Sequence, residues 1–462
     1  MSLSGAHRVH FVGIGGAGMS AIAKVLIERG VDVSGSDLKR SPVAGMLEAI
    51  GARVNIGHDA NLVQDADVVV VSSAIPEWNP ELRRARELGL PLMSRGEALA
   101  GVLTGSRALV VAGTHGKTTT TSMMVTILRA AGVDPTYLIG GGLNDVGTNA
   151  RAGRGELAVA ESDESDGSFL LLTPHIGVVT NVEIDHVDYW SSLESLRDAF
   201  ARFMGSVAED GMIVVPASDD ELKRLAQASG RRFVSFGDGG AITAADIELD
   251  FSSVHFRLCR DEEQGDVTLR VPGLHNVANA LAAAAACSEA GVPVDEIAAG
   301  LNAFRGVERR FQWRGEVAGV TVIDDYAHHP TEVRATLAAT RPGPWRRVLA
   351  VFQPHRYSRT AALADEFGGS FADADRVVVT DVYGAGETAV PGVTGKLIAD
   401  SVCAHLPGRP TAYLPRRAEL VEYLAAVTRA GDAVFTLGAG DVSSVGDELL
   451  ARLGARRREA RR

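Results

Sequence analysis

The sequence predicts an α/β protein made of three domains. Strand-like apolar runs alternate with helical patterns along most of the chain, which is typical of parallel sheets covered by helices. The chain has 462 residues, more than one hydrophobic core usually accommodates. Breaks in composition at residues 103–107 and after residues 309–311 divide the alternation into three parts. We therefore predict domains at residues 1–106, 107–311 and 312–462.

The first domain opens with a glycine-rich turn between a strand and a helix. An apolar strand pattern at residues 9–12 is followed by Gly-Ile-Gly-Gly-Ala-Gly at 13–18 and a helical pattern at 19–29. Asp37 then stands at the end of a second strand, as in dinucleotide-binding folds. Free backbone N–H groups at a helix start suit a pyrophosphate. NAD and UDP-sugars both carry one, so this fingerprint alone leaves the ligand open.

The second domain contains the most informative stretch, Leu-Val-Val-Ala-Gly-Thr-His-Gly-Lys-Thr-Thr-Thr-Thr at residues 109–121. Gly113 and Gly116 allow the backbone to approach phosphate oxygens closely. Lys117 can reach the outer phosphates, and the Thr118 hydroxyl can hold Mg²⁺. The stretch is a shortened variant of the phosphate loop, and it predicts a nucleoside triphosphate site.

Acidic segments follow two further strands of this domain. The strand at residues 157–160 precedes Glu-Ser-Asp-Glu-Ser-Asp at 161–166, and the strand at 176–180 precedes Asn-Val-Glu-Ile-Asp-His at 181–186. Oxygen ligands with one imidazole suit Mg²⁺ or Mn²⁺ rather than structural zinc. Together with Thr118 they could hold two divalent ions around a triphosphate. The alternative is that both segments are solvated acidic loops.

The remaining elements complete the second domain and form the third. A β-rich stretch at residues 231–272 leads to an Ala-rich helix at 278–290. His275, Asn276 and Asn279 precede this helix, where they could either cap it or bond the edge of a base. In the third domain, strands are expected at 320–323, 347–352, 376–380 and 433–437, with a helix at 331–339.

Composition and charge argue against two classes of function, nucleic-acid binding and membrane insertion. The net charge of −12 argues against general nucleic-acid binding, which needs a basic face. No long uncharged apolar run predicts a membrane span, and the first residues lead directly into a strand. The three cysteines lie far apart, so neither a disulfide framework nor a metal cluster is expected. These observations predict a cytoplasmic protein without nucleic-acid or membrane partners.

Seven motifs occur in order across all three predicted domains. They are 13–23 (GIGGAGMSAIA), 113–120 (GTHGKTTT), 161–169 (ESDESDGSF), 180–186 (TNVEIDH), 275–279 (HNVAN), 324–330 (DDYAHHP) and 353–360 (QPHRYSRT). This set resembles the Mur ligase family. The resemblance implies an N-terminal Rossmann-like domain, a central P-loop-type ATP-binding α/β domain and a C-terminal Rossmann-like α/β domain.

The resemblance also implies an ATP-dependent amide synthesis in peptidoglycan precursor formation. The first and last motifs are similar to those of members that add L-alanine to the lactyl carboxylate of UDP-N-acetylmuramate through an acyl phosphate. A recycling member that attaches a preformed peptide is the near alternative. An NAD-dependent oxidoreductase with an added ATP-binding lobe and a non-enzymatic nucleotide sensor are alternatives of other classes.

Roles for individual residues follow from the same resemblance. Lys117, Glu161, His186 and Arg310 are the expected catalytic residues. ATP is expected at Gly113, Thr114, His115, Gly116, Lys117, Thr118, Thr119, His275, Asn276, Asn279, Arg310 and Asp325. Thr118 would hold one Mg²⁺ (or Mn²⁺), and Glu161 with His186 a second. The UDP-sugar is expected at Gly15, Gly16, Ala17, Gly18, Met19, Ser20 and Asp37.

The third domain is expected to bind the amino acid. Arg356 and Arg359 are three residues apart, and a guanidinium fork suits the carboxylate of a free amino acid. Tyr326, His328 and His329 could shape the alanine pocket. A surface salt-bridge role for the two arginines is the alternative.

One feature departs from part of the family. Some Mur ligases support the second metal with a carbamylated lysine downstream of the Asp-His pair. The lysines of this chain are Lys24, Lys39, Lys117, Lys223 and Lys396, and none falls within residues 187–222. Unless Lys223 lies close, we expect the second metal to be held without that group.

Overall fold

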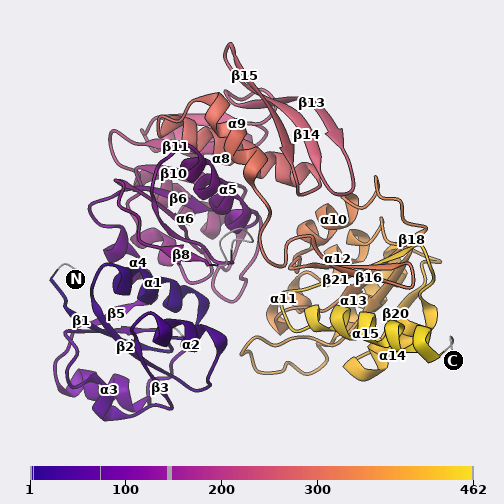
Figure 1. Cartoon of the computed structure of the whole chain (residues 1–462), viewed down its shortest axis with the longest axis horizontal. Coiled ribbons are helices and arrows are strands. Elements are labelled where there is room, and N and C mark those ends of the chain that lie inside the picture. The colour runs from indigo at the N-terminus through magenta and orange to yellow at the C-terminus, as the bar shows by residue number, and fades with distance from the viewer. Residues whose placement is uncertain (1–2, 4, 73, 143–147, 460–462) are drawn as a thin grey trace.

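The computed structural model describes residues 3, 5–72, 74–142 and 148–459. Three mainly parallel sheets, each flanked by helices, follow one another along the chain, and Figure 1 shows them as three lobes. The predicted three-domain α/β class is therefore confirmed. None of the helices in these residues is both long and apolar enough to cross a membrane.

The N-terminal sheet has five parallel strands in the order β3-β2-β1-β4-β5. Its strands are β1 (Arg8–Val12), β2 (Asp32–Asp37), β3 (Arg53–Ile56), β4 (Val68–Val71) and β5 (Leu92–Ser94). Its helices are α1 (Ala17–Glu28), α2 (Pro42–Ala49), η1 (Ala60–Val63), α3 (Pro80–Glu87) and α4 (Arg95–Leu103). The strand order reverses between β1 and β4, so a crevice for ligands opens at the carboxyl end of β1.

The central sheet has seven strands in the order β12-β11-β10-β6-β9-β7-β8, and only β8 runs antiparallel to its neighbour. Its strands are β6 (Arg107–Ala112), β7 (Thr136–Leu138), β8 (Ala150–Arg151), β9 (Leu157–Glu161), β10 (Ile176–Val179), β11 (Met212–Pro216) and β12 (Phe233–Phe236). Its helices are α5 (Lys117–Ala130), η2 (Ser168–Leu171), α6 (Leu193–Gly205), α7 (Asp220–Ala228), α8 (Leu274–Glu289) and α9 (Val294–Ala303).

Strand β6 is almost wholly apolar because both of its faces are buried. Side chains alternate between the two faces of a strand, and both faces of this strand are covered. Leu109 and Val111 pack into the core formed with α5, α8 and α9. Val110 and Ala112 face a second core that contains α6 and continues into the N-terminal domain around α1 and α4. The first two domains therefore share one continuous apolar core.

A three-stranded antiparallel sheet fulfils the prediction of a β-rich stretch at 231–272 together with β12. It consists of β13 (Thr243–Leu249), β14 (Val254–Arg260) and β15 (Glu263–Leu269). Figure 1 shows it at the top of the molecule, beside α9. Its buried face adds Val254, Phe256 and Leu258 to the core beneath α8 and α9.

The C-terminal sheet has the order β16-β17-β21-β18-β19-β20, with β16 as the antiparallel edge strand. Its strands are β16 (Gln312–Val317), β17 (Val320–Asp325), β18 (Arg347–Phe352), β19 (Arg376–Val379), β20 (Thr411–Tyr413) and β21 (Asp432–Leu437). Its helices are α10 (Pro330–Ala338), α11 (Tyr357–Ala362), α12 (Ala364–Ser370), α13 (Gly395–His405), α14 (Arg417–Val427) and α15 (Ser443–Glu459).

Candidate active site

The predicted phosphate loop joins β6 to α5. Gly113 has φ +132° and Gly116 has φ +80°, a region that only glycine adopts without strain. Space also requires glycine, because a Cβ at Gly113 would collide with the Thr180 hydroxyl and one at Gly116 with the Asn279 side-chain oxygen. No side chain caps the start of α5, so its first backbone N–H groups are available to an anion.

Lys117 is the first residue of α5 and points back along the loop. Its Nζ donates to Gly113 O at 2.6 Å and lies 2.8 Å from Glu164 Oε2. Burial disfavours the charge, but the Glu164 and Asp163 carboxylates outweigh burial and raise the pKa of Lys117 above its ordinary value. The loop therefore holds a permanent positive charge at the position where the outer phosphates of a nucleotide would lie.

Carboxylates and one imidazole gather opposite Lys117. Asp163, Glu164 and His186 each offer a ligand atom within 4.8 Å of the others. Glu161 lies at the end of β9, where it accepts from the Thr118 hydroxyl. Within the described part of the chain, Glu161 Oε2, Glu164 Oε1 and His186 Nδ1 are buried without a hydrogen-bond partner.

These orphaned atoms fit a divalent cation. Burial raises the pKa of Glu161, and it raises the pKa of Glu164 to about 8 although Lys117 is adjacent. Burial lowers the pKa of His186, which leaves its ring neutral and able to ligate a metal. A bound cation would compensate the buried carboxylates and occupy the unpaired atoms. His186 also has φ +49°, a conformation that costs energy in a residue with a side chain.

Glu164 was not among the predicted site residues. The sequence shows three acidic residues directly after β9, namely Asp163, Glu164 and Asp166, but not which of them turn inward. In the structure Glu164 is almost fully buried beside Lys117, and its backbone oxygen accepts from the Trp190 indole at 3.0 Å. Lys223 lies elsewhere: it pairs with Asp220 at 2.8 Å within α7 and does not line the cleft described below.

A cavity of about 200 Å³ lies beside the phosphate loop. Phe236, Val271 and Phe304 form its apolar wall. The predicted ATP-binding residues in its lining are His115, Gly116, Thr119, His275, Asn276, Asn279, Arg310 and Asp325. An apolar wall with convergent polar groups suits a nucleotide base.

The prediction that His275, Asn276 and Asn279 precede their helix is wrong. Helix α8 begins at Leu274, and its N-cap is Gly273, which has φ +96° and no side-chain capping bond. The Pro272-Gly273 turn therefore starts the helix four residues before the expected start. Asn276 donates to Pro272 O at 2.7 Å and accepts from Asn279 at 3.3 Å. The capping alternative is thereby removed.

A larger cleft, of about 440 Å³, lies between the central and C-terminal domains. The predicted residues that line it are Thr114, His115, Gly116, Lys117, Thr118, Glu161, His186, Arg310, Tyr326, His328, Arg356 and Arg359. Arg310 lies 3.5 Å from Glu332 and 5.1 Å from the centre of the Tyr326 ring. Burial raises the pKa of Asp325 to about 6. The structure thus brings the phosphate loop, the acidic cluster and the third-domain motifs to one cleft.

The two arginines of the last motif already have protein partners. Arg359 binds Asp185 through two 2.9 Å hydrogen bonds, and both side chains are buried. Arg356 lies 3.1 Å from Asp188 and is more exposed. The salt bridges of the alternative interpretation therefore exist, although that of Arg359 is buried rather than on the surface.

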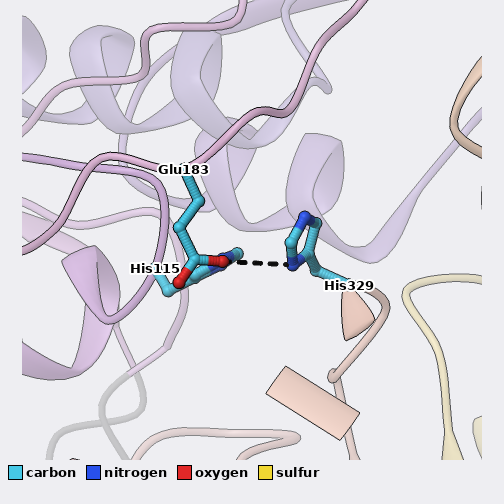
Figure 2. A group of neighbouring side chains, drawn as sticks. All are labelled: His115, Glu183 and His329. Atoms are coloured by element: carbon cyan, nitrogen blue, oxygen red, sulfur yellow. Dashed lines mark hydrogen bonds and ion pairs between the residues drawn. The ribbon is translucent and has the colours of Figure 1, made fainter. Parts of the chain in front are cut away.

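His329 does not lie with Tyr326 and His328. It is the N-cap of α10 and is almost fully buried, with its ring 4.5 Å from that of His115. Figure 2 shows His329 facing Glu183, which comes from the loop after β10. This residue therefore belongs to the contact between the two domains rather than to the lining of the cleft.

The glycine-rich turn of the first domain leads into α1 as predicted. Asp37 ends β2, and its carboxylate accepts from Gly15 N at 2.9 Å. Gly16 caps α1 without a side-chain bond, which leaves backbone donors for a pyrophosphate. Met19 and Ser20 are buried, and the Ser20 N–H donates to Gly16 O at 2.8 Å, so the free backbone donors belong to the residues before Ser20.

Arg95 is a further residue that the sequence reasoning missed. It is the first residue of α4, lies against Gly18 and pairs with Asp166 of the central domain at 3.0 Å. Its guanidinium thus stands between the glycine-rich turn and the acidic loop after β9. No motif marks Arg95, because its position depends on how the first two domains pack.

Known proteins resemble the chain along almost its whole length. Three domain families match: the Mur ligase family catalytic domain at residues 8–107, the Mur ligase middle domain at 111–287, and the Mur ligase glutamate ligase domain at 309–440. A UDP-N-acetylmuramate–L-alanine ligase of Rubrobacter xylanophilus is 50% identical over 448 residues, which cover 96% of this chain and 100% of the relative.

Two solved structures are similar as well. The UDP-N-acetylmuramate–alanine ligase of Thermotoga maritima has a TM-score of 0.81 at 30% identity, covering 97% of this chain and 99% of that one. The murein peptide ligase of Psychrobacter arcticus has a TM-score of 0.71 at 27% identity, with the same coverage. Because Mur ligase family models match all three domains and a 50% identical relative covers 96% of the chain, the chain belongs to the Mur ligase family.

Proposed function

We propose that this protein is an ATP-dependent ligase that joins L-alanine to the lactyl carboxylate of UDP-N-acetylmuramate in peptidoglycan precursor synthesis. The observation that carries the proposal is the single cleft in which the Lys117 loop and the acidic cluster face Tyr326, His328 and Arg356. The curated relatives named for this reaction support the substrate assignment. We place the reaction in the cytoplasm.

The chemistry requires two successive transfers. An oxygen of the lactyl carboxylate attacks the γ-phosphorus of ATP, and the bond to ADP breaks. The α-amine of L-alanine then attacks the carbonyl carbon of the acyl phosphate. The tetrahedral intermediate expels inorganic phosphate, and the nitrogen loses a proton as the amide forms. Each step brings anions together, so positive groups must be fixed in advance.

The central domain supplies these groups. The Lys117 ammonium would leave Gly113 O and Glu164 for the outer phosphates, and the N–H groups at the start of α5 would bind the same phosphates. Thr118 would hold one Mg²⁺, and Glu161 with His186 a second, with Glu164 as an added ligand. The metal, when bound, neutralises charge between the γ-phosphate and the acceptor carboxylate.

The outer domains would hold the other substrates. The glycine-rich turn at 15–18, with Asp37, would bind the UDP part of the sugar nucleotide. In the C-terminal domain, Arg356 would exchange its exposed partner Asp188 for the alanine carboxylate, whereas the pair of Arg359 with Asp185 is buried. We propose domain limits at residues 1–106, 107–311 and 312–462, which the family matches at 8–107, 111–287 and 309–440 support.

Phosphate release measured with ATP, UDP-N-acetylmuramate and each of alanine, serine and glycine tests the proposal. Release should require both the sugar nucleotide and the amino acid, and it should be fastest with L-alanine. Release supported better by a muramyl tripeptide than by L-alanine would favour the recycling ligase. ATP binding without any release would favour a nucleotide sensor, and tight NADH binding without competition by the UDP-sugar would favour an oxidoreductase.

A further inference from the structure

A second cluster of metal-ligating side chains lies outside the acidic cluster. It consists of His115 from the phosphate loop, Glu183 from the loop after β10 and His329 at the start of α10. Each offers a ligand atom within 4.8 Å of the others. Figure 2 shows the Glu183 carboxylate beside the His115 ring, with the His329 ring facing it from the C-terminal domain.

The spacing fits a tetrahedral ion. His115 Nε2 lies 3.3 Å from Glu183 Oε2, and His329 Nδ1 lies 3.8 Å from the same oxygen. Ligand atoms about 2.0–2.1 Å from a tetrahedral zinc ion are about 3.3 Å from one another. The separation of His115 Nε2 from Glu183 Oε2 already has this length, and a small approach of His329 Nδ1 would shorten the second separation to it. A bound ion would replace the 3.3 Å contact that His329 Nδ1 accepts from Thr331 N.

The outer nitrogens of both rings face acceptors. His115 Nδ1 lies 3.6 Å from Glu332, and His329 Nε2 lies 3.3 Å from Ile184 O. Histidines that ligate metals usually donate their second N–H to a carboxylate or a backbone carbonyl, which fixes the ring and its tautomer. Thr331 Oγ1 also donates to Glu183 at 2.6 Å and orients that carboxylate.

The ligand set differs from that of the acidic cluster. Two imidazoles and one carboxylate with an open fourth position suit Zn²⁺ or Co²⁺, whereas Mg²⁺ prefers oxygen ligands. His329 is almost fully buried and Glu183 is 40% exposed, so solvent can reach the open side through Glu183. The nearby Glu332 adds a second negative charge to attract a cation.

We infer that His115, Glu183 and His329 form a binding site for a transition-metal ion of the Zn²⁺ class, distinct from the Mg²⁺ site of the reaction. The ion would join the phosphate loop of the central domain to the first turn of α10 in the C-terminal domain. His115 also lines the cavity assigned to the nucleotide base. Zinc would therefore hold the domains together over the nucleotide and slow turnover, which is the consequence that depends on the proposed function.

Binding of Co²⁺ to the full-length protein in excess Mg²⁺ tests the site without any activity measurement. Wild type should bind one Co²⁺ with the visible absorption of a four-coordinate ion, and Zn²⁺ should displace it. His329→Gln should weaken Co²⁺ binding by at least about 10²-fold, and Glu332→Gln by about 10- to 100-fold through loss of the negative charge beside His115 Nδ1. Glu183→Gln serves as a second ligand variant if His329→Gln does not fold, as judged by circular dichroism.

Two histidine variants are matched controls. His186→Gln alters the acidic cluster and His255→Gln an exposed histidine on β14, and both should retain the Co²⁺ absorption. Absorption that survives His329→Gln and Glu183→Gln, or that disappears with His186→Gln, would overturn the inference. If phosphate release proves to need other substrates while Co²⁺ binding follows His329, the proposed function fails and the metal site stands.

Discussion

The buried ion pair between Arg359 and Asp185 links the C-terminal domain to the central domain. Its removal should therefore change the equilibrium between docked and separated domains by a measurable amount. Arg359 comes from α11 of the C-terminal domain and Asp185 from the loop after β10 of the central domain. Their side chains are 4% and 6% exposed and share two hydrogen bonds of 2.9 Å. The arginine holds the pKa of Asp185 well below its usual range despite burial.

Arg359→Met leaves the Asp185 carboxylate buried without its partner. Removal of one member of a buried pair costs about 3–5 kcal/mol. Separation of the domains hydrates the carboxylate and relieves that cost, so the docking equilibrium should shift toward the open state by roughly 10²- to 10⁴-fold. Dyes on the exposed Cys403 and the partly exposed Cys259, with Cys287 buried, allow the change to be followed by energy transfer.

Arg356→Met is the matched control from the same segment. Its partner, Asp188, is 45% exposed, so loss of this pair should cost no more than about 1 kcal/mol. The double variant Asp185→Leu with Arg359→Met removes both buried charges and should regain most of the docking. Equal energy transfer in wild type and Arg359→Met, or equal losses in the two arginine variants, would refute the reasoning.

Three further predictions concern the same cleft. Lys117→Ala should lower turnover by at least about 10²-fold, because a preorganised charge is lost; full activity would remove the phosphate-loop assignment. Arg356→Ala should raise the KM for alanine far more than that for ATP, and equal effects would count against its role. Burial opposes protonation of His115, but Glu183 and Glu332 raise its pKa to about 9. In the metal-free protein, protonation of this ring therefore stabilises the fold fully below its ordinary pKa of 6.5, and this contribution is lost as the pH rises through 9. The thermal midpoint should fall over that range in wild type and more weakly in His115→Gln.

Local chemistry made much of the fold predictable from sequence. Strand β18 (Arg347–Phe352) was predicted to the residue, because a continuous apolar run between charged and turn-forming residues has no other stable placement. The phosphate loop was also predictable, because a backbone that closely approaches an anion needs glycine at fixed positions, here Gly113 and Gly116. The start of α8 was not, since it depends on a left-handed glycine after Pro272.

Features that depend on domain packing could not be predicted. The Arg359–Asp185 pair joins residues 174 positions apart, and no pattern in either segment identifies the other. The placement of Arg95 beside Gly18 and Asp166 likewise arises only when the first two domains come together. Glu164 turns inward within the central domain, toward Lys117 and Trp190, and no local pattern separates it from the neighbouring acidic residues. His329 was assigned to the amino-acid pocket with its neighbour His328, but the start of α10 directs the two side chains to different places.

The apolar core that runs without interruption from α1 and α4 into α6 has a mechanical consequence. Because the N-terminal and central domains share this core, they should move as one rigid body. The glycine-rich turn and the phosphate loop then keep a fixed position relative to each other. The sugar nucleotide and ATP would then keep a fixed mutual position throughout the cycle. The C-terminal domain, which would bind the amino acid, is then the part free to move. Its closure would determine when the three reactants come together.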